Sequence, residues 1–192
     1  MKSALPYIKF IFYGEIFITA CCAIYIPWWL RVFRPNTVHR WTEGASGILL
    51  LFTTLFGILG VISLVHGIKL TPNASSAPVS GPVLLSIGIF GYLIFGILTY
   101  FIAHRPLTTE LFLIIGWTIL ELQTLSRLLG CGFSGKNKSI FLLFLILAAL
   151  FFNLILYVLY YKMEPLKAYY WAAAPLAADG AASFIFAISL MV

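Results

Sequence analysis

The stretch SIFLLFLILAALFFNLILYVLYYK, residues 139–162, decides the fold. It is long enough to cross the hydrocarbon core of a bilayer as one α-helix, which needs about 20 predominantly apolar residues. Its only strongly polar side chain away from the two ends is that of Asn153. The stretch therefore predicts a transmembrane helix with one polar group near its middle.

The rest of the chain has the same character. Hydrophobic residues make up 62% of it and charged residues 9%, whereas soluble domains carry about 25% charged residues. Apolar segments of sufficient length predict spans near residues 7–30, 46–68, 82–103, 109–129, 139–162 and 168–191. We therefore expect an all-α, polytopic integral membrane bundle of about six transmembrane helices, forming one domain over residues 1–192.

The net charge of +6 is carried by basic residues scattered through short loops, which favours contact with lipid headgroups and not with nucleic acid. The loops after spans 1, 3 and 5 carry slightly more basic residues than the opposite face. Two glycosylation sequons, at Asn73 and Asn137, lie on the less basic face. We expect both termini to be lumenal or extracellular, both asparagines to be candidate glycosylation sites, and the membrane to be that of the endoplasmic reticulum.

Several common functional motifs are missing from the sequence. It contains no HExxH, no clustered Cys/His set, no Gly-rich phosphate loop and no GxSxG, so we expect neither a metal ion nor a cofactor. The three cysteines, Cys21, Cys22 and Cys131, are too few for a disulfide framework and suit apolar filler. The spans show no internal repeat, which weakens a transporter interpretation.

Three of the six acidic residues, Glu15, Glu121 and Asp179, lie inside apolar runs. An ionisable side chain at such a position costs several kcal/mol unless it is protonated, paired or facing a polar cavity. Asp179 is surrounded by alanine and glycine, which let helices approach closely, and Pro175 frees the backbone carbonyl of Trp171 one turn earlier. We expect this last span to be packed inside the bundle.

The fourth span places Trp117 one turn before Glu121, on the same helical face. Asn153, in the fifth span, has a similar depth and can orient a carboxyl. Glu15 lies nearer the amino-terminal membrane face, with Thr19 one turn away, so a proton shared with a neighbouring helix and a catalytic role both remain open. We favour Glu121 and Asp179 as the acid/base pair, with Glu15 as a third candidate. A structural role for each acid, as a paired or hydrogen-bonded carboxyl, is the alternative.

In the third span Gly88, Tyr92, Gly96 and Tyr100 recur every fourth residue. Such a stripe is typical of helix packing. It also offers recesses for a flat ligand, and we expect Tyr92 and Tyr100, with Trp117, to be candidate aromatic walls of a substrate site.

Apolar surroundings favour the neutral form of a carboxyl, which is a good proton donor, and aromatic walls stabilise a cation. This combination suits acid-initiated reactions of lipophilic molecules that enter laterally from the bilayer. Candidate reactions are epoxide opening with cyclisation, isomerisation of a double bond, and epoxide hydrolysis.

Two short stretches, Trp117-Thr118-Ile119-Leu120-Glu121 and Asp179-Gly180, resemble the small fungal-type membrane-bound terpenoid cyclases, which carry a Trp/Glu-bearing helix and an Asp-Gly in the last helix. The resemblance implies that Glu121 and Asp179 are catalytic acids acting on an epoxidised meroterpenoid. The chain departs from that family in its number of spans and in the spacing and position of its Trp and Glu.

Other functions remain open on the sequence. A non-catalytic receptor, chaperone or assembly subunit, working with partner membrane enzymes, is the main alternative. A proton-coupled transporter is a further one.

Overall fold

A computed structural model describes residues 5–33, 43–72, 77–104, 108–133 and 135–191. In chain order the helices are α1 (Pro6–Val32), α2 (Glu43–Leu70), α3 (Gly81–Ala103), α4 (Thr109–Gly130), α5 (Lys136–Leu159), α6 (Pro165–Trp171) and α7 (Ala174–Met191), with one 3-10 turn at Tyr160–Lys162. Prolines stand in the first turn of α1, α3 and α6. The missing N–H has no helical partner at that position, so proline starts a helix there without loss.

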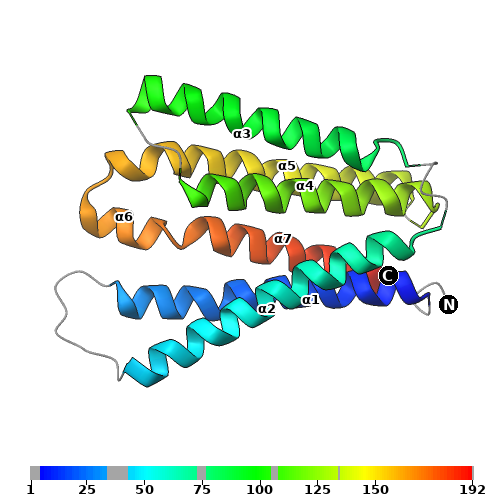
Figure 1. Ribbon diagram of the computed structural model, residues 1–192, viewed down its shortest axis with the longest axis horizontal. Coiled ribbons are helices and arrows are strands. Elements are labelled where there is room, and N and C mark those ends of the chain that lie inside the picture. The colour runs from blue at the N-terminus through cyan, green and yellow to red at the C-terminus, as the bar shows by residue number, and fades with distance from the viewer. Residues whose placement is uncertain (1–4, 34–42, 73–76, 105–107, 134, 192) are drawn as a thin grey trace.

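Among the residues that the structure describes, six helical segments are long and apolar enough to cross a membrane, which confirms the predicted all-α, multi-pass architecture. These segments are Pro6–Val32, Ala45–Leu70, Gly81–Ile102, Glu110–Gly130, Lys136–Leu159 and Pro165–Met191. The start of α1 and the end of α7 lie at the same end of the bundle, as an even number of crossings requires (Figure 1).

The sixth segment is not one continuous helix. It is interrupted at Ala172 and Ala173, between α6 and α7. Pro175 lies just after the interruption, and its ring has no N–H to donate to the preceding turn. The proline predicted to free a backbone carbonyl therefore marks a division of the span into two helices.

The helix α7 lies between two parts of the bundle (Figure 1). On one side it packs against α1, which in turn pairs with α2; on the other it packs against α5, which pairs with α4. Helix α3 packs on the outer side of α4. The α4 and α6–α7 spans are each 44% buried, compared with at most 28% for the other four. The two favoured acids, Glu121 and Asp179, are therefore carried by the two most buried spans.

The main core joins side chains from five helices. It includes Ile11 of α1, Leu64 of α2, Leu128 of α4, Ile146 of α5 and Phe186 of α7, each almost fully buried. A second, smaller cluster is formed by Leu111, Ile114 and Tyr157, between α4 and α5.

Helices α1 and α2 approach closely because glycines lie along their contact. A Cβ atom added at Gly14 would lie 2.6 Å from the Leu64 Cγ and 2.9 Å from the Leu64 backbone nitrogen. One added at Gly67 would lie 3.0 Å from the backbone nitrogen of Ile11. Close backbone contact through glycine is a main source of helix association in a bilayer, where the lipid is as apolar as the side chains.

Replacing Gly14 with alanine is therefore expected to destabilise the bundle. The added methyl group meets backbone that cannot move without separating the two helices, and overpacking of this kind costs about 1–3 kcal/mol. Gly91→Ala, on α3, is the matched control, because a Cβ there meets nothing within 4 Å. The measurement is the unfolding midpoint in detergent; equal midpoints for the two variants would contradict the close packing described.

Candidate functional site: a buried carboxyl cluster

Asp179 of α7 is held by Asn153 of α5. The Asn153 Nδ2 donates a hydrogen bond of 2.6 Å to the Asp179 Oδ1, and both side chains are buried. The Oδ1 of Asn153 has no hydrogen-bond partner among the described residues. The amide therefore fixes the orientation of the Asp179 carboxyl across the α5–α7 contact.

Glu121 of α4 is held by Ser183 of α7. The Ser183 hydroxyl donates to the Glu121 Oε1 at 3.2 Å. The indole Nε1 of Trp117 donates in turn to the Ser183 oxygen, also at 3.2 Å. Trp117 and Glu121 lie one turn apart on α4, so both reach the same hydroxyl. A three-membered hydrogen-bonded chain thus links α4 to the central helix.

Glu15 of α1 joins the same site. Its carboxyl is fully buried and lies close enough to the Glu121 carboxyl and the Ser183 hydroxyl to interact with both. Within the described residues, neither Glu15 carboxyl oxygen nor the Glu121 Oε2 receives a hydrogen bond from an N–H or O–H donor. The Thr19 hydroxyl, one turn further along α1, donates to the Glu15 backbone carbonyl at 2.9 Å.

The electrostatics of the cluster require a proton. Among the described residues, no lysine, arginine or histidine acts on any of the three carboxyls, while Glu121 acts on both Glu15 and Asp179. Two adjacent buried carboxylates without a neighbouring cation cannot both be ionised at low cost, because like charges repel and burial disfavours the charged form. A proton shared between Glu15 and Glu121 removes one charge and supplies the missing donor.

Small residues bring α1 and α7 close enough to assemble this cluster. A Cβ atom added at Gly180 would lie 2.8 Å from the Cβ of Cys22. The Thr19 hydroxyl also contacts the Gly180 carbonyl oxygen at 3.3 Å. The alanine and glycine around Asp179 therefore have a packing role, since a larger residue at 180 would separate Glu15 from Glu121.

Of the aromatic residues expected to line the site, some lie in it and others lie elsewhere in the bundle. Trp117 is part of it, as described above. Tyr92 packs against the second cluster, with its ring 6.1 Å from that of Phe112, which lies on the opposite face of α4 from Glu121. Tyr100 is 58% exposed. The expected gathering of Tyr92 with the acids is thus not observed, and Gly88, whose added Cβ would lie 2.7 Å from Ile119, serves helix packing.

The remaining predicted residues lie elsewhere. Asn137 is exposed in the first turn of α5, while its sequon partner Ser139 is buried and bonded to the Gly135 carbonyl. The other sequon asparagine, Asn73, lies outside the described residues. The three cysteines are free thiols. In the part of the chain that the structure describes, no three His, Cys, Asp or Glu side chains are arranged to hold a metal ion.

Sequence reasoning did not identify Ser183 as a functional residue. Its hydroxyl is the point where α4 and α7 meet, and it is fully buried. The sequence feature that could have identified Ser183 is its spacing of four residues from Asp179, which places both side chains on one face of α7. Sequence reasoning also favoured Glu121 and Asp179 as partners, whereas the structure places Glu15 directly beside Glu121.

Comparisons with known proteins give no further guide: no protein-family model, curated protein or solved structure matches this chain.

Replacing Ser183 with alanine is expected to lower the free energy of unfolding by about 1–3 kcal/mol, because the indole of Trp117 and one oxygen of Glu121 lose a buried partner. Ser189→Ala on the same helix is the matched control. The Ser189 hydroxyl donates only to the Phe186 carbonyl of its own helix, so its loss is expected to stay within about 0.5 kcal/mol. Thermal unfolding in detergent measures both; equal losses would show that the Ser183 bridge contributes little.

Proposed function

We propose that this protein is a membrane-embedded enzyme that uses intramembrane carboxylic acids for acid/base chemistry on a lipophilic substrate. The observation that carries the proposal is the convergence of Glu15, Glu121 and Asp179, from three helices, without any basic partner in the described residues. Structural acids inside a bilayer are generally paired with a cation or saturated with donors. Within the part of the chain that the structure describes, this cluster instead leaves three carboxyl oxygens without an N–H or O–H donor.

The two parts of the cluster suit opposite roles. The Glu15–Glu121 pair, sharing a proton, is the proton donor, and Ser183 with Trp117 fixes the direction in which Glu121 points. Asp179, oriented by Asn153, is the proton acceptor. Pairs of titratable groups in unlike environments are the usual basis for dividing acid and base roles in one site.

For an epoxide substrate the proposed reaction balances without a cofactor. The glutamate pair protonates the epoxide oxygen, and the carbon–oxygen bond breaks with its electrons passing to that oxygen. A carbon–carbon double bond of the same molecule attacks the resulting cation, and Asp179 removes a proton from the ring that forms. That proton then returns to the glutamate pair, so the enzyme ends the turnover in its starting state. The product is an isomer of the substrate. In the hydrolytic version, water attacks the cation and the product is a diol. The face of Trp117 offers cation–π stabilisation beside Glu121.

The proposed location is the endoplasmic reticulum, with the lipophilic substrate entering from the bilayer. The apolar spans and the two sequons support it. Meroterpenoid-like and polyketide-like molecules are the proposed substrate class, which follows from the resemblance of the Trp117–Glu121 and Asp179-Gly180 stretches to membrane-bound terpenoid cyclases.

The test is turnover of an epoxidised prenyl-aromatic compound by the purified protein in liposomes, followed by mass spectrometry for an isomer or a hydrated product. Glu121→Gln and Asp179→Asn are each expected to reduce turnover about 100-fold or more, since general acid or base catalysis contributes at least that much. Glu164→Gln is the control, because that exposed residue pairs only with Lys167 at the surface. All three proteins must keep the wild-type unfolding midpoint for the comparison to count.

A non-catalytic receptor, chaperone or assembly subunit is the second candidate, and one observation favours it. Glu15 and Glu121 are fully buried, so a substrate reaches them only if helices separate. Under this alternative Glu121→Gln and Asp179→Asn lower the unfolding midpoint or break association with a partner protein, and no epoxide is consumed by the wild type. Flux of protons across liposomes that depends on Asp179 would favour a transporter instead.

A further inference from the structure

A groove on the lipid-facing side of the bundle lies apart from the carboxyl cluster. Its volume is about 540 Å³, and it is lined by residues of α4, α5 and the start of α3. Helices α3 and α5 both pack on α4 more extensively than on each other, so a channel remains between them with α4 as its floor. Ligand pockets in proteins typically occupy about 300–1,000 Å³.

The walls of the groove are apolar and its polar groups are nearly all satisfied. Leu122, Leu125 and Leu129 of α4 form the floor, and Ile140 and Leu143 of α5 form one side. Its two serines are engaged within the protein. Ser126 donates to the Val79 carbonyl at 2.9 Å and accepts from the Val79 N–H at 3.2 Å, and Ser139 donates to the Gly135 carbonyl.

The bonds between Ser126 and Val79 have a second effect. They fix the segment that precedes α3 against α4, at the mouth of the groove. The groove is therefore formed before any ligand arrives, and a ligand does not have to order that segment when it binds. Preorganisation of this kind favours binding by removing an entropic cost.

The groove lining contains one charged group, the ammonium group of Lys136. Lys136 is exposed and begins α5. Among the described residues it forms no salt bridge. The positive end of the α5 dipole adds to the lysine charge at this point. A long apolar channel with a cation at the membrane surface fits a molecule that has an aliphatic chain and an anionic head.

We propose that this groove binds a membrane phospholipid, with one acyl chain along Leu122, Leu125 and Leu143 and the phosphate at Lys136. Because Lys136 is at the first position of α5, the bound lipid belongs to the leaflet at that end of the helix, and a phospholipid with a net negative charge binds best. The site does not depend on the catalytic proposal, because its lining contains none of the three buried acids.

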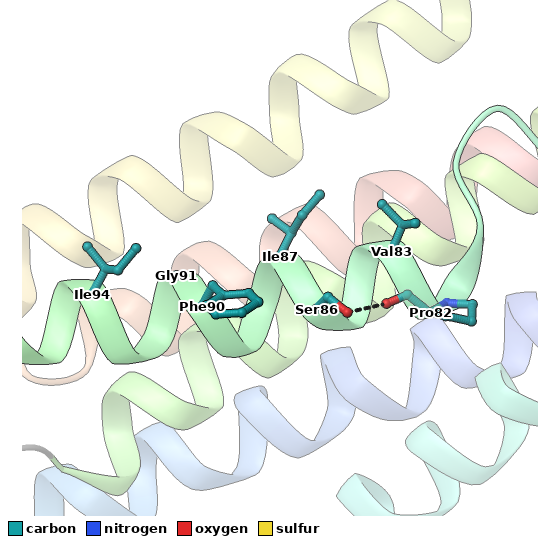
Figure 2. Close-up of a pocket in the computed structure, with 7 residues that line it drawn as sticks. All are labelled: Pro82, Val83, Ser86, Ile87, Phe90, Gly91 and Ile94. Carbon is teal, nitrogen blue, oxygen red and sulfur yellow. Dashed lines mark hydrogen bonds between the residues drawn. The ribbon is translucent and has the colours of Figure 1, made fainter.

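A second hollow of similar volume on α3 provides the internal comparison. It is lined by residues of α3 alone and carries no charged side chain, and its Ser86 hydroxyl donates to the Pro82 carbonyl of the same helix (Figure 2). Lipid that merely surrounds the protein contacts this face as readily as the groove. A specific site must retain lipid better than this face does.

The experiment uses the full chain in phosphatidylcholine vesicles containing a small fraction of photoreactive phosphatidylglycerol, an anionic phospholipid, with a diazirine on one acyl chain. Labelled peptides are mapped by mass spectrometry. We expect labelling at Leu125, Ile140 and Leu143 to exceed labelling at Phe90 on the α3 face by at least about fivefold, the ratio expected from one lysine–phosphate attraction at a membrane surface. If labelling depends only on the exposed area of each side chain, with no preference for the groove over the α3 hollow, the proposal is overturned.

Two variants with matched controls separate the acyl and phosphate contacts. Leu143→Trp fills the groove and is expected to abolish the preferential labelling of the groove. Leu85→Trp, at an exposed position on α3 outside the groove lining, is expected to preserve that preference.

Lys136→Gln is expected to lower groove labelling about fivefold. Lys69→Gln, which changes a lysine in the last turn of α2, is expected to leave groove labelling unchanged. Equal loss in both lysine variants would show attraction to overall charge and would overturn the assigned site.

Unlabelled competitors identify the chemistry of the head. Added unlabelled phosphatidylglycerol must displace the label from the groove, while inorganic phosphate at the same concentration must not, because it lacks the chain. Displacement by oleyl alcohol as effective as that by phospholipid would show that the phosphate is not recognised, and the proposal would fail on that point.

Discussion

The burial of the Glu15 and Glu121 carboxyls beside one another, which calls for a proton shared between them, is the constraint on which the rest of this structure depends. Both side chains are fully buried in a bundle whose outer surface is apolar, and no basic side chain in the described residues acts on them. Two negative charges in contact there would cost a large part of a typical protein's net stability. The proton makes the contact favourable, and it also provides the reactive group of the proposed chemistry.

The architecture follows from the need to bring that pair together. Helix α7 lies between the α1–α2 pair and the α4–α5 pair, and it contributes Ser183 to one carboxyl and Asp179 to a second polar contact. Glycine at 180 allows α1 to approach α7 closely enough for Glu15 to reach Glu121. The division of the last span near Pro175 separates α7 from α6, so that α7 packs at the centre of the bundle. The small residues of α7 therefore set the geometry of the acids.

The fold was largely predictable because a bilayer imposes length and composition on any helix that crosses it. All six spans were found, and the Ala/Gly-rich surroundings of Asp179 correctly indicated a central helix. The polar contacts were harder to predict, since depth along a helix says nothing about rotation around it. Tyr92 shares a depth with the acids but packs on the far side of α4. Glu15 appeared off-centre in the sequence and is nevertheless a direct neighbour of Glu121. Which carboxyls meet depends on helix packing through Gly14 and Gly180, which the sequence alone does not orient.

The most direct test of the shared proton is infrared spectroscopy of the reconstituted protein at neutral pH, observing the C=O stretching band of a protonated carboxylic acid and its shift in heavy water. The structure predicts such a band in the wild type and a clear loss of its intensity in the Glu15→Gln/Glu121→Gln double variant, which removes the pair while keeping its shape. A wild-type spectrum without the band, or a double variant that retains it in full, would contradict the account.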